Sequence, residues 1–130
     1  MGRGRTISVT EDMAIGATNV DILRNLTSLT KLAEDSVVAV YLVGESVDVT
    51  AAVKMGNFEA MSSGPIPIDT TVGQAPTVPD DRMVLTDGEN GETISIPVSN
   101  ANAAAQSCSA IVRIIPAEDL LAFPQLLETL

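Results

Sequence analysis

Apolar residues recur at every second position in several short stretches of this chain, which is the pattern of half-buried β-strands. The alternating stretches cover residues 6–14, 46–55, 92–99 and 107–115. Residues 36–43 are apolar almost without a break, which favours a strand covered on both faces. Shorter strands are expected at residues 57–61 and 82–86.

Turn residues separate these stretches at short and fairly even intervals, which is typical of an antiparallel β-sandwich or barrel. Gly44-Glu45 suits a hairpin turn between the strands 36–43 and 46–55. The proline-rich residues 64–79 predict an edge strand and a long loop, with Ile66 and Ile68 touching the core. Alternation predicts that the core contains Val38, Val40, Val49, Val53, Ile94, Ile96, Val112 and Ile114.

Two stretches have helical rather than alternating spacing. Leucines and Ile22 recur every three to four residues within 20–33, which predicts a helix there. Residues 117–130 predict a second helix, interrupted by Pro124. This end is strongly apolar, with Leu120, Leu121, Phe123, Leu126, Leu127 and Leu130. A terminal stripe of this kind must cover either its own sandwich or that of a neighbouring copy, and the sequence leaves both options open.

The length of 130 residues fits one domain, with a flexible basic arm at 1–5, a sandwich at 6–116 and a helical tail at 117–130. The formal net charge of −10 opposes binding to nucleic acid or to an anionic membrane. Only the arm, through Arg3 and Arg5, is expected to touch phosphates, and then weakly. No stretch is apolar enough to predict a membrane span, so no membrane partner is expected.

Catalytic equipment is nearly missing from the sequence, since it has no His, no Trp and one Cys. Without a histidine, Cys108 and the serines have no imidazole base, so Cys108 is expected to be a small buried hydrophobe. The acidic residues 87–92 are compatible with a Ca²⁺ loop, but their spacing is not that of an EF-hand, and a hairpin turn is favoured. We therefore expect no enzymatic activity, no cofactor and no metal.

The strand SVVAVYLVGESVDVTAAVKMG leads into the proline-rich PIPIDTTVGQAPTVPDDRMVL. A glycine-bearing turn, a strand that ends at Asn100 and a last strand, SCSAIVRIIP, then follow. This order of segments over residues 36–116 resembles that of small single jelly-roll capsid and decoration proteins of bacterial and archaeal viruses. The resemblance implies a jelly-roll-like sandwich of about seven or eight strands, and it implies no catalytic residues.

Two functions fit these observations. The first is a virion structural protein, a coat or capsid-decoration subunit that assembles symmetrically with copies of itself and other capsid proteins. The alternative is a non-catalytic carbohydrate- or protein-binding β-sandwich module, which the scarcity of aromatic residues disfavours. For the first function, the candidate assembly contacts are Arg3, Arg5, Leu120, Leu121, Phe123, Leu126 and Leu127.

Overall fold

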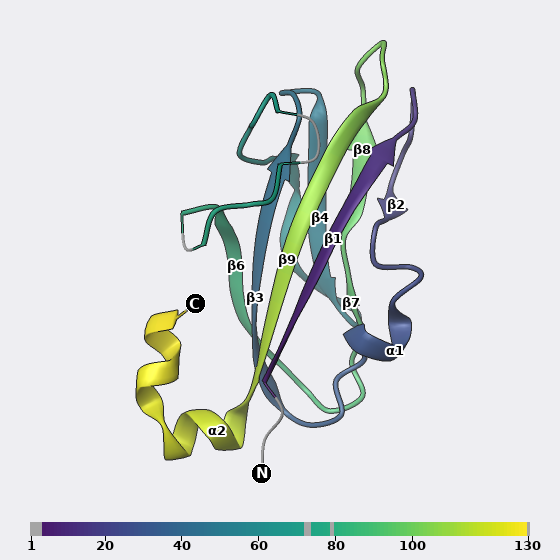
Figure 1. Ribbon diagram of the computed structural model, residues 1–130. Helices are drawn as coiled ribbons and strands as arrows, with labels where there is room; N and C mark the ends of the chain where they lie inside the picture. Colours follow the sequence, from purple (N-terminus) through teal and green to yellow (C-terminus); the bar gives the residue numbers. More distant parts are fainter. Residues whose placement is uncertain (1–3, 72–73, 79, 130) are drawn as a thin grey trace.

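The computed structural model describes residues 4–71, 74–78 and 80–129, which form two antiparallel sheets packed face to face (Figure 1). Sheet A contains, in spatial order, β1 (Arg5–Met13), β9 (Gln106–Pro116), β3 (Ser36–Gly44) and β6 (Arg82–Gly88). Sheet B contains β2 (Val20–Asp21), β8 (Pro97–Asn100), β4 (Val49–Met55) and β5 (Phe58–Pro65), and β7 (Ile94–Ser95) also pairs with β4. The antiparallel β-sandwich predicted from the sequence is confirmed.

The strand pairs follow the plan of one long hairpin wrapped around the core. Its arms pair β1 with β9, β2 with β8, β3 with β6 and β4 with β5. Further pairing of β3 with β9 and of β4 with β8 closes each sheet. With β7 and β8 counted as one interrupted strand, this is the eight-stranded, double-sheet topology of a jelly roll.

The core lies between the two sheets and is built by the alternating residues. All eight predicted core residues are buried: Val38, Val40, Val49, Val53, Ile94, Ile96, Val112 and Ile114. On β3, Val38, Val40 and Leu42 belong to this core. Ala39 and Tyr41 point to the opposite face of the sheet, where they are buried in a second cluster. The prediction that this strand is covered on both faces is therefore correct.

The predicted helix over residues 20–33 is wrong. This segment forms β2, a turn and only a four-residue helix, α1 (Thr27–Thr30). The carboxylate of Asp21 accepts hydrogen bonds from the backbone N–H groups of Leu23 (2.9 Å) and Ile96 (3.0 Å), and Ile22 N–H donates to the Ile96 carbonyl (3.2 Å). These bonds tie the segment to the opposite strand, and they also divide the predicted strand 92–99 into β7 and β8.

The predicted hairpin at Gly44-Glu45 is also wrong, because β3 and β4 belong to different sheets. Gly44 pairs instead with the proline-rich loop, since its N–H donates to Pro67 and its carbonyl accepts from Asp69 (both 2.9 Å). In that loop Ile66 is buried as expected, whereas Ile68 is exposed and does not reach the core. Alternation alone does not distinguish a hairpin from a strand that crosses between sheets.

Candidate assembly surface

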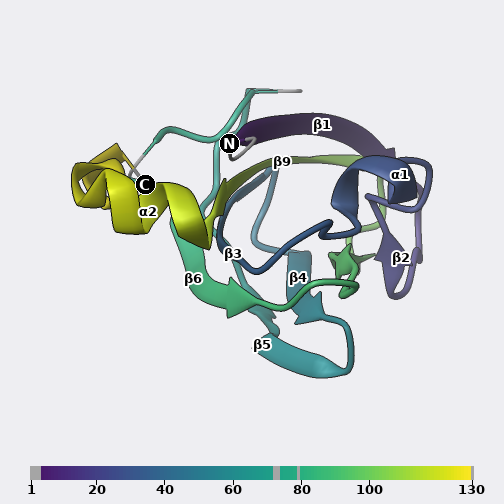
Figure 2. The same cartoon turned by 90° about the horizontal axis from the view of Figure 1, so that it is seen from below.

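The C-terminal segment leaves the end of β9 and lies outside sheet A, as the view from below shows (Figure 2). It consists of α2 (Ala117–Ala122) and a 3-10 helix, η1 (Pro124–Thr129). Proline has no N–H for a helical hydrogen bond and disfavours helical geometry in the residue before it. Phe123 is accordingly extended (φ −135°), and the predicted interruption at Pro124 is confirmed.

This segment packs on the outer face of its own sheet. Leu120 and Leu126 contact a small cluster on that face, formed by the buried Ala39, Tyr41 and Ile115 with Val37 and Ile111 beside them. At the start of α2, Ala117 N–H donates to the Asp35 carbonyl (2.9 Å). The tail therefore covers its own subunit, which is one of the two options that the sequence left open.

The docking of this segment is incomplete, because α2 contains no buried residue. A hollow of about 410 Å³ separates the tail from the ends of β1 and β9, with Thr6, Arg113 and Leu126 among its lining residues. A second hollow of about 390 Å³, lined by Val37, Leu85 and Leu120 among others, lies between α2 and β6. The tail thus rests on the sheet through a few side chains rather than through a continuous packed face.

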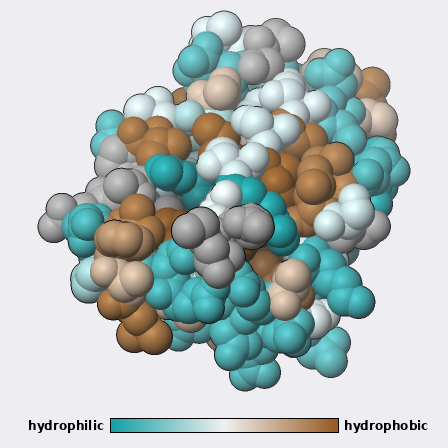
Figure 3. Space-filling view, turned by 60° about the horizontal axis from the view of Figure 1, so that its bottom comes forward, coloured by the Kyte–Doolittle hydropathy of each residue, from teal (hydrophilic) through white to brown (hydrophobic). Residues whose placement is uncertain are grey.

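Apolar side chains remain exposed on and beside the tail. Leu121 is 85% exposed and Phe123 is 56% exposed, and on β6 the exposed Leu85 faces Leu120 across the second hollow. We call Leu85, Leu120, Leu121 and Phe123 the C-terminal apolar surface. With the bottom of the molecule turned forward, apolar side chains gather at the lower left of the space-filling view, on the side where α2 lies (Figure 3).

Leu85 is a member of this surface that the sequence did not predict. The alternation of β6 turns Val84 inward and Leu85 outward, so an exposed leucine was readable from that short strand. Its position beside the tail was not readable, because the two segments are far apart in the sequence.

Acidic residues border the C-terminal apolar surface. Asp87 lines the second hollow, and a third hollow of about 240 Å³ beside Leu121 is lined by Glu34, Asp35 and Glu118. Charges at such a rim contribute to the choice and the rate of association, and salt screens them. A partner of this surface must therefore offer apolar side chains at its centre and cations or neutral polar groups around them.

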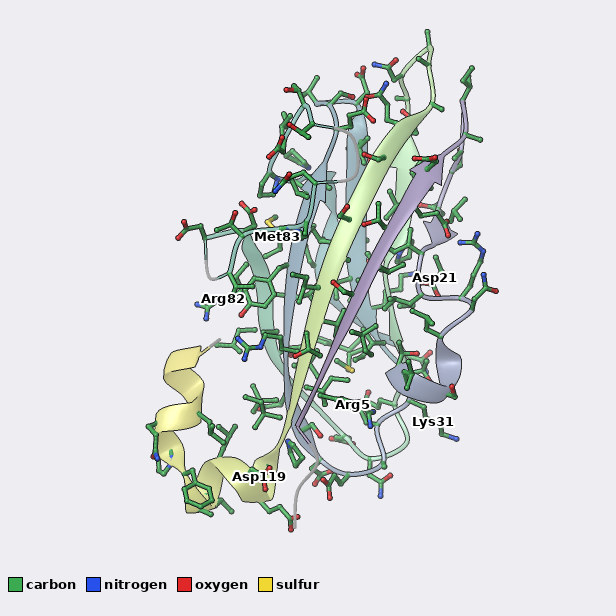
Figure 4. All side chains as sticks on the ribbon, in the orientation of Figure 1. Arg5, Asp21, Lys31, Arg82, Met83 and Asp119 are labelled. Carbon is green, nitrogen blue, oxygen red and sulfur yellow. The ribbon has the colours of Figure 1, made fainter. Side chains whose placement is uncertain are left out.

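Three further candidate contacts were predicted from the sequence: Arg3, Arg5 and Leu127. Arg3 and the side chain of Leu127 lie outside the part of the chain that the structure describes. Arg5 is the first residue of β1 rather than part of a free arm, and it lines the same hollow as Leu126. Its guanidinium donates to the Lys31 carbonyl at 3.1 Å, so this side chain joins two parts of its own subunit (Figure 4).

The sequence also singled out Cys108 and the acidic residues 87–92 as candidates for chemistry. Cys108 is fully buried, and burial raises the pKa of its thiol from 9.0 to about 12. In the turn at 87–92, the carboxylate of Glu92 accepts the N–H of Glu89 (2.7 Å), while Asp35 accepts that of Asn90 (2.9 Å). Among the described residues, no three or more acidic or cysteine side chains gather as metal ligands would.

In the part of the chain that the structure describes, no helix is long and apolar enough to cross a membrane.

Comparison with known proteins identifies no family for this chain. No family model matches it, and no curated protein matches it. Among solved structures, it is similar to a chain in the acidic stable capsid structure of Helicobacter pylori bacteriophage KHP30, with 10% sequence identity and a TM-score of 0.40. The match covers 89% of this chain and 94% of that chain, so a distant structural neighbour comes from a phage capsid.

Proposed function

We propose that this protein is a virion structural protein, a coat or capsid-decoration subunit that works by symmetric self-assembly and has no catalytic activity. The observation that carries the proposal is the C-terminal apolar surface, where Leu121 and Phe123 are exposed to solvent. Exposed leucine and phenylalanine side chains that gather beside a loosely docked tail mark a surface for association. Copies of the same chain, or other capsid proteins, are the proposed partners.

The jelly-roll topology is compatible with more than one function, because one fold serves many functions. Jelly rolls occur in viral capsid proteins, in lectins and in cupins. This sequence has no histidine, which is the commonest metal ligand, and it has one Tyr, two Phe and no Trp. Tyr41 is fully buried, so two phenylalanines are all that the chain has to stack on a ligand. A structural role suits this inventory better than a ligand-binding one.

The charge of the chain supports an outward-facing position in the virion. A net charge of −10 repels the genome, so the body of the domain is not expected to package nucleic acid. Contact with phosphates is expected only at the basic N-terminal residues, and only weakly. The same charge keeps free subunits apart until specific contacts form.

The proposal is tested by the mass of the purified full-length protein, measured by light scattering over a range of concentrations, followed by electron microscopy. We expect closed oligomers or particles, since self-complementary surfaces close by symmetry. A double variant, Leu121→Ser with Phe123→Ser, is expected to reduce the assembled fraction strongly. Leu29→Ser is the matched control, because Leu29 is also exposed (44%) but lies on α1.

Two results would overturn the proposal. One is a protein that stays monomeric at high concentration and is not recruited by virus particles. The other is an assembled fraction that Leu29→Ser lowers as much as the double variant, since loss of any exposed leucine would then have the same effect.

One observation favours the alternative of a binding module. The outer face of sheet B has a hollow of about 320 Å³ lined by Asn19, Ala52, Lys54, Glu59, Ser63 and Pro97. Its polar groups suit a small polar ligand such as a sugar, although no aromatic side chain lines it. Retention on immobilised glycans by a monomeric protein, lost on Lys54→Ala, would favour this alternative over assembly.

A further inference from the structure

The four outermost strands of the two sheets differ in how well they are protected against further pairing. β2 has two residues, and the pairing of β5 and of β6 with their neighbours contains register shifts. Short strands and bulges are the usual ways of blocking an open edge. β1 has neither, because its nine residues pair with β9 in one unbroken register, from Arg5 with Ile114 to Met13 with Gln106.

The outer edge of β1 has open hydrogen-bonding groups. Apart from the Met13 carbonyl, which accepts a bond from the Asn100 side chain (3.1 Å), no backbone group of β1 bonds to anything except β9 among the described residues. In both ribbon views β1 is the last strand at the margin of sheet A (Figures 1 and 2). An edge of this length, with unpaired N–H and C=O groups, is a template for another strand.

We propose that β1 pairs with β1 of a second copy of this chain, antiparallel and around a two-fold axis at Ser8. The proposal rests on the proposed function and names one of its assembly contacts. In this register Ser8 faces Ser8, Ile7 faces Val9, Thr6 faces Thr10 and Arg5 faces Glu11. Each of these pairs stabilises an antiparallel ladder, since β-branched residues, hydroxyls and opposite charges lie directly across from one another.

Charge complementarity selects a second copy as the occupant of this edge. The chain is strongly acidic, so most of its surface repels another copy. The proposed register places the cation of Arg5 opposite the anion of Glu11 twice, once on each side of the axis. Glu11 already pairs with Arg24 of its own chain (2.6 Å), and it keeps 24% of its side chain exposed for a further partner.

The resulting dimer leaves the rest of the molecule available for assembly. The two four-stranded sheets A would join into one continuous sheet of eight strands, which follows from their strand order. The C-terminal apolar surface includes β6, at the other margin of sheet A, so it stays outside the two-fold contact. Two different contacts per subunit are what an extended shell requires, whereas one isologous contact closes at a dimer.

A disulfide across the axis tests the register. Directly opposed residues in an antiparallel pair have Cα atoms about 4.5–5.5 Å apart, which lies within the range for a disulfide. Ser8→Cys is therefore expected to convert most of the protein into a covalent dimer under mild oxidation, seen on a non-reducing gel. Ser62→Cys, also exposed but on the edge strand β5, is the matched control and is expected to stay monomeric. The native Cys108 is buried and does not compete.

Charge reversal tests the Arg5–Glu11 pairs. Arg5→Glu and Glu11→Arg each place like charges opposite one another in a homodimer, and each is expected to weaken dimerisation at least about tenfold. A mixture of the two variants restores opposite charges at both positions, so it is expected to form a mixed dimer. Analytical ultracentrifugation measures all three samples, with circular dichroism to verify that each variant is folded.

The outcomes separate this proposal from the proposed function. If the native protein assembles but Ser8→Cys does not cross-link, or cross-links no better than Ser62→Cys, the pairing of β1 is overturned and assembly uses another surface. If the mixed charge variants fail to dimerise while the native protein dimerises, the register is overturned. If the native protein is a monomer that no particle recruits, both the pairing and the proposed function fail.

Discussion

The interior of the sandwich and the C-terminal segment are both rich in aliphatic side chains, but they use them differently. Ile96 and Val98 are completely buried between the sheets, whereas α2 contains no buried residue and Leu121 is 85% exposed. Apolar residues that alternate along strands are therefore used in folding. Only some apolar side chains of the tail pack on the sheet, and the exposed ones are available for contacts between subunits.

The two regions also differ in how their backbones are held. β3 is paired along its whole length with β9 on one side and, from Ser36 to Tyr41, with β6 on the other. The tail follows β9 as a short helix and a 3-10 turn, and it contacts the sheet through Leu120 and Leu126. Regions with few buried contacts open at low free-energy cost, so the tail is suited to adjust when a partner binds.

The largest effect is expected in the interior. Ile96→Ala should lower the free energy of unfolding by about 2–5 kcal/mol, because it removes buried methyl groups and leaves a cavity. Ile15→Ala is the matched control, since Ile15 is 67% exposed, and its effect should stay within about 0.5 kcal/mol. Urea denaturation of both variants measures the difference. Equal losses would show that burial between the sheets does not determine stability.

A smaller effect is expected for the buried polar residue Asn100. Its side-chain amide donates to the carbonyls of Met13 (3.1 Å), Ala14 (3.2 Å) and Ala104 (3.1 Å), and so joins the ends of β1, β8 and β9.

Asn100→Ala leaves these carbonyls without that donor and should cost about 1–3 kcal/mol in thermal or urea unfolding. Asn25→Ala, at an exposed position, is the control and should have little effect. A neutral Asn100→Ala would mean that water replaces the amide at no cost.

Local patterns were enough to predict the elements in which each residue depends mainly on its neighbours. The strand at 107–115, the core residues such as Val112, and the break at Pro124 all follow from alternation or from the chemistry of one residue type. Each needs no knowledge of the partner strand, because a period of two buries one face whatever lies opposite.

Elements that depend on distant partners were not predictable in this way. The segment 20–33 has helical spacing, but Asp21 binds the backbone of Ile96, 75 residues away, and this long-range bond prevents the helix. The predicted turn at Gly44 fails for the same reason, since its hydrogen bonds go to the loop at Pro67 and Asp69.

The candidate surface was predictable in part. The stripe from Leu120 to Leu127 is visible in the sequence, and Leu120 and Leu126 do pack on sheet A. The approach of Leu85 to this stripe depends on the pairing of β6 with β3, which the sequence does not reveal.

A modest, pH-dependent effect is expected for Cys108 in the core. Burial raises the pKa of its thiol to about 12 in the folded protein, so the folded state disfavours the thiolate. The unfolded chain ionises this group above pH 9, and its contribution to stability is therefore complete below pH 9 and is lost as the pH rises toward 12.

Cys108→Ala removes this contribution, and its unfolding free energy should fall less steeply above pH 9. Cys108→Ala should be less stable than the native protein at pH 7 because it lacks the side chain, and this deficit should shrink by about 1 kcal/mol at pH 10. Urea denaturation at pH 7, 9 and 10 measures this difference. Identical pH dependence for the two proteins would mean that the thiol is accessible to water in the folded state.

The smallest effect on folding is expected at Leu121. A comparison with its neighbour Leu120 tests which side chains of the tail stabilise the fold and which contact a partner. Leu120 is half-buried against sheet A, so Leu120→Ser should lower the unfolding free energy, by about 1 kcal/mol. Leu121 is exposed, so Leu121→Ser should change it by less than about 0.5 kcal/mol. Association should respond in the opposite order, because Leu121 is free to contact a partner. Urea denaturation and light scattering on the same two samples give both rankings. If Leu120→Ser reduces assembly more than Leu121→Ser does, with the monomer still folded, then the tail acts through its docked side, and the exposed side chains are not the assembly contacts.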